Sequence, residues 1–163
     1  MTAHSKGVVS KVMHSVCLRY AGYFNHRRDR RGPLFQGRYW ASIIESQGYF
    51  FVVMRYIELN PVRAGMVALP GQFPWSSHAH VTGKPEWRVE ITPHDEFLQL
   101  GATPEARGRA WAEFVRRGIP QEELDRIRRR FSRNRPYGSA AFEKRLETIG
   151  DGSQEPSPIL QTT

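Results

Sequence analysis

The chain has 163 residues, of which 39% are hydrophobic and 12% aromatic, so one domain with its own core is expected. A net charge of +8 and a pI of about 10.1 predict a polyanionic partner, most simply nucleic acid. The single Cys17 excludes an intrachain disulfide framework and fits a reducing cytoplasm. No apolar run approaches the roughly 20 residues that cross a membrane, so no membrane partner is expected.

The N-terminal part of the sequence predicts one helix, one loop and one strand. Ser5 is a candidate cap for a helix that runs to about Asn25, since apolar residues follow at helical spacing. The charged run HRRDRRGP, residues 26–33, predicts a loop. Aromatic and β-branched residues then predict a short strand around Tyr39 to Ile44.

A second helix is predicted from about Gln47 to Leu59. Pro61 lacks an amide hydrogen and disfavours a helical conformation at Asn60, so we expect the helix to end there. Asn60 then caps one further turn, PVRA, and Gly65 closes that turn with a positive φ.

The last third predicts three short helices with tight turns between them. The first is capped by Thr103 and closed by Gly118, the second begins at Pro120, and the third begins at Ser139. Three such helices are typical of a small DNA-binding module of helix-turn-helix type. The polar segment from Asp151 onward predicts a disordered tail.

Four segments occur in one order along the chain: AGYFNHRRDRRGPLFQGRYWASII, RYIELNPVRAGMV, FPWSS and RPYGSAAFEKRLE. Together they resemble the REP-associated tyrosine transposases, bacterial single-tyrosine transposases of the HUH class. The resemblance covers most of the chain from about Ser10 to Leu146, and YIELNPVRAG is its most specific piece. It implies a ferredoxin-like domain with an antiparallel sheet over residues 1–90, incomplete here because its first strands are missing. With the helical DNA-binding module over 91–150 and the tail over 151–163, the expected fold is α+β.

The resemblance also implies a chemistry. Tyr56 matches a nucleophile that attacks a DNA phosphodiester, forms a 5′-phosphotyrosine link and frees a 3′-hydroxyl, so that strands are cut and rejoined in transposition. Asn60, one helical turn later, matches the third ligand of an Mg²⁺ or Mn²⁺ site. The implied substrates are single strands with short palindromic hairpins. From the residues alone, a tyrosine at this position of a helix is usually a core aromatic, and Asn60 fits a helix cap as well as a metal ligand.

One part of the family pattern is not found where it is expected. The His-hydrophobic-His metal motif of the family precedes its first helix, whereas MTAH alone precedes Ser5 here. We therefore expect an N-terminally truncated chain, from a misplaced start or a decayed gene, with weak or no strand cleavage. His78 and His80 match the motif by letter, but they follow Tyr56 and lack a strand around them, so they are weak candidates for a metal site.

Two groups of arginines are the predicted DNA contacts. The first alternates with aromatic residues, which suits single-stranded DNA, and the second suits hairpin phosphates. Three functions remain open: a transposase-family DNA-binding protein, a non-catalytic protein that recognises palindromic DNA, and a basic structural protein. The predicted contacts are Arg27, Arg28, Arg30, Arg31 and Arg38, then Arg126, Arg128, Arg129, Arg130, Arg133 and Arg135.

Overall fold

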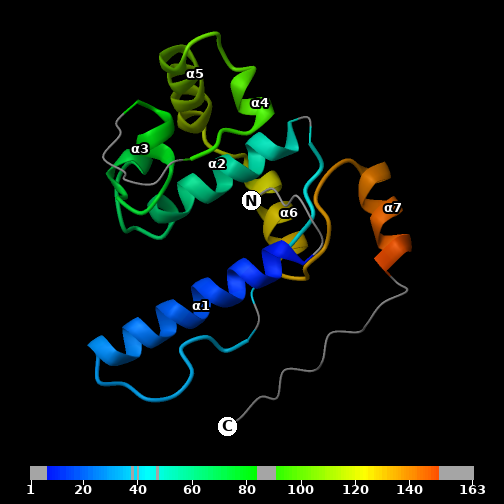
Figure 1. Cartoon of the computed structure of the whole chain (residues 1–163). Helices are drawn as coiled ribbons and strands as arrows, with labels where there is room; N and C mark the ends of the chain where they lie inside the picture. The colour runs from blue at the N-terminus through cyan, green and yellow to red at the C-terminus, as the bar shows by residue number, and fades with distance from the viewer. Residues whose placement is uncertain (1–6, 38, 40, 47, 84–90, 151–163) are drawn as a thin grey trace. The chain divides into compact units, whose positions relative to one another are not determined.

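A computed structural model of the chain describes residues 7–37, 39, 41–46, 48–83 and 91–150 (Figure 1). Two compact units are distinguished, residues 1–41 and 42–163. The described ranges contain seven α-helices and one 3-10 helix. None of these helices combines the length and the apolar character that a membrane crossing requires. The predicted tail and the predicted cap Ser5 lie outside the described residues.

The predicted ferredoxin-like antiparallel sheet is wrong. Within the described residues, the only extended pairing is a parallel bridge between Ile44 and Tyr137. The Tyr137 amide donates to the Ile43 carbonyl at 2.9 Å, and the Glu45 amide donates to the Tyr137 carbonyl at 3.0 Å. A β-branched run becomes a strand only where a second extended segment offers a row of partners. Among the described residues, the segment around Ile44 pairs with Tyr137 alone, so an isolated bridge forms and no strand.

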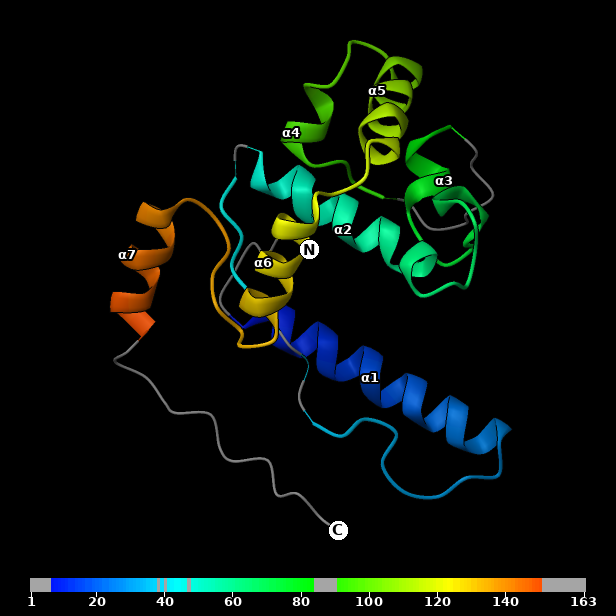
Figure 2. The same ribbon diagram turned by 180° about the vertical axis from the view of Figure 1, so that it is seen from behind.

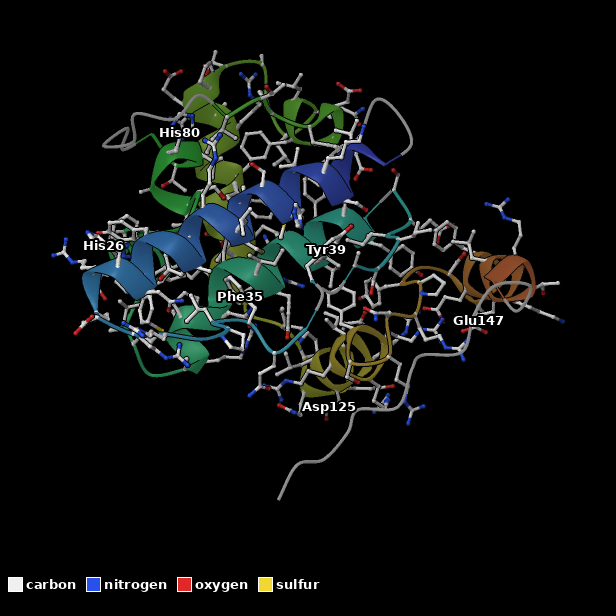
Figure 3. The ribbon with its side chains drawn as sticks, turned by 60° about the horizontal axis from the view of Figure 1, so that its bottom comes forward. His26, Phe35, Tyr39, His80, Asp125 and Glu147 are labelled. Carbon is white, nitrogen blue, oxygen red and sulfur yellow. The ribbon has the colours of Figure 1, made fainter. Side chains whose placement is uncertain are left out.

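In the first unit, helix α1 spans Val8–Arg27 and confirms the first predicted helix. A loop follows it and is held by the Asn25 side-chain amide, which donates to the Gly32 carbonyl at 2.9 Å. The Phe35 ring, labelled in Figure 3, lies 6.3 Å from the Tyr20 ring. No residue of α1 is buried, so its apolar side chains form no enclosed core.

In the second unit, helix α2, Tyr49–Arg63, packs against both α5, Pro104–Arg116, and α6, Gln121–Phe131 (Figures 1 and 2). On one side, Phe51 of α2 meets the buried Trp111 of α5, with 5.7 Å between ring centroids. On another, Val53 of α2 forms a buried cluster with Ile127 of α6 and Tyr137. Helix α2 is therefore the central element of this unit.

Shorter elements complete the second unit: the 3-10 helix η1, Pro70–Gln72, and the helices α3, His78–Val81, and α4, Asp95–Leu98. Helix α7 spans Ala140–Gly150. The predicted starts of α5 at Thr103 and of α7 at Ser139 are confirmed by side-chain caps, and α6 follows Pro120 as predicted. The Thr103 hydroxyl accepts from the Ala106 amide at 3.2 Å, and the Ser139 hydroxyl accepts from the Phe142 amide at 3.3 Å.

The predicted end of the second helix is wrong, because α2 continues through Pro61 to Arg63. Gly65, whose φ is +67° as predicted, follows the C-cap Ala64 and closes the helix. The Met66 amide donates to the Pro61 carbonyl and the Gly65 amide to the Val62 carbonyl, both at 3.0 Å. These two bonds form a Schellman termination, which closes the carbonyls of the last turn. Asn60 therefore lies inside a continuous helix and caps no separate turn.

The Tyr137 ring is fully buried and packs against both α2 and α6. Its hydroxyl donates to the Glu123 carboxylate of α6. Its ring lies edge-on to Tyr49 at 5.5 Å and to Phe131 at 6.0 Å. Burial is the largest cause that raises the pKa of the Tyr137 hydroxyl well above its ordinary value, and the bond to Glu123 adds to the shift.

This raised pKa predicts a loss of stability at alkaline pH. An unfolded tyrosine ionises near its ordinary pKa of about 10, whereas the folded hydroxyl keeps its proton to higher pH. The unfolding free energy is therefore full below about pH 10 and falls above it, by up to about 1.4 kcal/mol per pH unit. Urea unfolding between pH 8.5 and 11.5 tests this. Tyr137→Phe should flatten the alkaline slope, and the exposed-site control Tyr20→Phe should leave it unchanged.

Candidate nucleic-acid interface

Tyr56 lies in the middle of α2 with a fixed ring and an uncommitted hydroxyl. The ring stands edge-on to Phe131 of α6, at 6.0 Å and 87°, and packs against the buried cluster of Val53, Ile127 and Tyr137. The side chain is half-buried. Its hydroxyl makes no hydrogen bond within the described part of the chain, whereas the Tyr137 hydroxyl is bonded to Glu123. Of these two tyrosines, Tyr56 is thus the one whose hydroxyl is free to react.

Arg63 is the closest positive charge to the Tyr56 ring. Its guanidinium carbon lies 4.8 Å from the ring centroid. It donates to the Tyr56 carbonyl at 2.6 Å and to the Asn60 side-chain oxygen at 2.7 Å. Both acceptors belong to residues that share one face of α2 with Arg63.

A second cation, Arg128 of α6, lies near enough to influence Arg63. Burial is the largest cause that lowers the pKa of Arg63; Tyr56 opposes this shift, and the positive charge of Arg128 adds to it. Arg128 is exposed and its nearest carboxylate, Asp125, lies 3.8 Å away. Asp125 is labelled on α6 in Figure 3. Arg63 therefore places positive charge beside the Tyr56 ring, and a bound phosphate would relieve the repulsion between Arg63 and Arg128.

The geometry around Asn60 does not fit the expected Mg²⁺ or Mn²⁺. Its side-chain oxygen already accepts from the Arg63 guanidinium, and a metal ion there would meet a second positive charge. In the described ranges, no group of three or more His, Cys, Asp or Glu residues could hold a metal ion. The metal expectation therefore stays a prediction from the resemblance, and no chemical step is assigned to it here.

His78 and His80 lie on the short helix α3, and Figure 3 labels His80. Residues two apart on a helix point about 200° apart, so the two rings are not placed to share one ion. The His78 ring instead lies 2.5 Å from a carboxylate oxygen of Glu58, which is 1% exposed. The same oxygen accepts from the Trp111 indole at 2.9 Å. This buried cluster ties α2, α3 and α5 together.

Two of the predicted DNA-contacting arginines hold α6 to α7. Arg126 donates to the Gly138 carbonyl and pairs with Glu143 at 2.9 Å. Burial alone would lower the pKa of Arg126, but the carboxylates of Glu143 and Glu123 raise it. Arg130 pairs with Glu143 at 3.1 Å and with Glu147, labelled in Figure 3, at 2.9 Å. These two arginines are committed to the fold.

The other four predicted arginines of this region are exposed at the end of α6 and in the turn after it. Only Arg128 has an ion pair among the described residues, the long one to Asp125. Cations at a helix C-terminus are favoured by the helix dipole, so the positions are compatible with a stable helix. We call this set the α6 basic end: Arg128, Arg129, Arg133 and Arg135.

In the first unit, four of the five predicted arginines are described and all four are exposed. Arg27 donates to the Tyr23 hydroxyl at 3.2 Å, and Arg30 donates to the Pro33 carbonyl at 3.5 Å. Arg28 and Arg31 have no side-chain partner in the described part of this unit. Arg38 lies outside the described residues.

Arg63 is a residue of the candidate site that the sequence alone did not indicate. It stands three residues after Asn60 and seven after Tyr56, which puts all three on one face of an uninterrupted helix. The spacing was visible in RYIELNPVRAG, but the helix break expected at Asn60 hid it.

Comparison of the chain with protein-family models, with curated proteins and with solved structures finds no match.

Proposed function

We propose that this chain is a DNA-binding protein of transposase type, in which Tyr56 exchanges phosphodiester bonds of single-stranded or hairpin DNA. One observation carries the proposal: the Tyr56 hydroxyl makes no hydrogen bond within the described residues, and its ring is held against Phe131 beside the Arg63 guanidinium. A guanidinium beside the tyrosine, with the positive charge of Arg128 acting on the same arginine, suits the negative charge of a phosphodiester and the charge that develops as it reacts.

In the proposed step, one bond to phosphorus forms and one breaks. The Tyr56 oxygen attacks phosphorus and forms a tyrosine–phosphate bond, while the bond from phosphorus to the 3′ oxygen breaks. The tyrosine proton passes to solvent, and the leaving 3′ oxygen takes up a proton to become a 3′-hydroxyl. Attack by a 3′-hydroxyl on the linked phosphate reverses the step and rejoins the strand. An unperturbed tyrosine has a pKa of about 10, so it needs help in losing its proton but leaves readily in the reverse step.

Covalent trapping tests the proposal. A hairpin oligonucleotide labelled at its 3′ end would be incubated with the chain in buffers with Mg²⁺ or Mn²⁺ and analysed on a denaturing gel. We expect a labelled protein band larger by the retained strand, since the 5′ phosphate stays on the tyrosine. Tyr56→Phe should lose this band completely and keep hairpin binding within about twofold, because only the reacting oxygen is removed.

Tyr20→Phe is the matched control, since Tyr20 is exposed in the other unit. It should keep the adduct. A labelled band that persists in Tyr56→Phe would show that another group is the nucleophile.

A second candidate function is non-catalytic recognition of hairpin DNA. The α6 basic end favours it, because these exposed arginines offer phosphate contacts that do not require Tyr56 to react. Salt-sensitive hairpin binding without any adduct would support this function over the first.

A further inference from the structure

A pocket of about 410 Å³ opens beside α2, between its second half and the segment that leads to α3. Its walls are mainly apolar, with Ile57 and Pro61 on α2 and Phe73 and Trp75 on the facing segment. The polar residues of its lining are Glu58, which is 1% exposed, Asn60, Ser76 and Ser77. A mostly apolar cavity with a few placed polar groups is typical of a site for a small flat ligand.

Trp75 is the unusual member of this pocket. Its side chain is 78% exposed, whereas Trp111 is 2% exposed in the core of the same unit. An indole ring left in water at the mouth of an apolar pocket is a surface on which a planar group can stack. Stacking on an aromatic ring is the main way in which proteins bind unpaired bases.

The pocket adjoins the Tyr56 site along α2. Asn60 belongs to both, because it lines the pocket while its oxygen accepts from Arg63. Ile57, on the pocket wall, is the next residue after Tyr56. The Asn60 side-chain nitrogen makes no hydrogen bond within the described residues, so it can donate to an acceptor on a base edge. A strand with its phosphate at Tyr56 would therefore have a base within reach of the pocket.

We propose that this pocket binds one unpaired base of the strand whose phosphate lies at Tyr56, with the base stacked on Trp75. This inference rests on the proposed function. The charge favours a nucleic-acid occupant over an apolar protein segment, because the net charge is +8 and Arg63 borders the shared residue Asn60. The apolar walls and the exposed indole suit a base better than a phosphate, so sugar-phosphate stays at the arginines and the base enters the pocket.

A double-mutant cycle, which combines protein variants with modified oligonucleotides, tests the pocket. Hairpin oligonucleotides with a single-stranded flank would carry an abasic spacer at one position at a time, and Kd would be measured at fixed salt. We expect one spacer position to weaken binding by about 5- to 100-fold, the range that one stacked base contributes. Trp75→Ala should weaken binding of the intact strand by a similar factor, and the two changes together should weaken it no further. Trp75→Phe keeps an aromatic face and should retain most of the affinity.

The controls separate the possible outcomes. Leu98→Ala removes another exposed apolar side chain away from the pocket and should leave every Kd unchanged. If the chain binds the hairpins but the Trp75→Ala and spacer losses add, or Trp75→Ala has no effect, the base pocket is wrong and the proposed function stands. A change in oligomeric mass in Trp75→Ala, with no spacer effect, would assign the pocket to a second copy of the chain. If the wild-type chain binds no oligonucleotide at low salt, the proposed function and the pocket assignment both fall.

Discussion

Replacing Glu58 with alanine is expected to lower the free energy of unfolding by about 3–5 kcal/mol, the range seen when one member of a buried polar pair is removed. The carboxylate is 1% exposed and one of its oxygens contacts both the His78 ring and the Trp111 indole. Its loss leaves buried polar groups without partners on two other helices and opens a cavity among three.

Chemical denaturation with circular dichroism measures this change, and Glu122→Ala is the matched control. Glu122 is exposed on the first turn of α6, so its removal should cost at most about 1 kcal/mol through the helix dipole. Glu58→Gln keeps the shape and one acceptor, and it should fall between the wild type and Glu58→Ala. Equal stability of the two alanine variants would mean that the buried cluster does not hold the helices together.

Neutralising the α6 basic end is expected to weaken hairpin binding at about 100 mM salt by roughly 100-fold or more, and to reduce the salt dependence of Kd. The four arginines are exposed and carry one weak ion pair among the described residues. Each phosphate contact that is lost lowers the slope of log K against log salt by about 0.7 to 0.9. If all four contact phosphate, Arg→Gln at the four positions should reduce the slope by about 3.

Fluorescence anisotropy at several salt concentrations measures both quantities. The control carries the same charge change at four exposed arginines elsewhere in the unit, Arg109, Arg116, Arg117 and Arg145. It should keep most of the affinity and most of the slope. Equal losses in the two quadruple variants would mean that net charge, and not the end of α6, attracts the DNA.

The helices were the part of the fold that the sequence could predict. Thr103, Gly118 and Ser139 carry local signals that act within one turn, and the structure places each of them at a helix end as expected. Local capping does not depend on the rest of the chain, so these helix boundaries could be predicted from the sequence.

The two errors of fold came from non-local causes. The residues before Glu45 have strand propensity, but a sheet depends on partners that propensity does not provide, and only Tyr137 pairs with them among the described residues. At Pro61, the local rule predicted a break. The helix nevertheless continues to Arg63, and its last turn is closed by the Schellman termination at Gly65.

The candidate site was predictable in position but not in composition. Tyr56 and Asn60 share a helical face as the spacing indicated. The contact between Tyr56 and Phe131, and the proximity of Arg128 to Arg63, join residues more than 60 positions apart, and no local pattern encodes them. The sequence also could not distinguish the arginines that pair with Glu143 from those that face water.

The distinction between paired and exposed arginines predicts which positions of the segment RIRRR, residues 126–130, can be substituted. Arg126 and Arg130 each use a forked guanidinium to reach a backbone carbonyl and a carboxylate at once. Lysine has a single charged nitrogen and cannot reproduce such a pair of directed bonds, so these two positions should tolerate only arginine. Arg128 and Arg129 need only a positive charge, so lysine should replace them freely. Homologous chains that keep this helix pair would therefore vary at the second and third arginines of the segment and stay constant at the first and fourth.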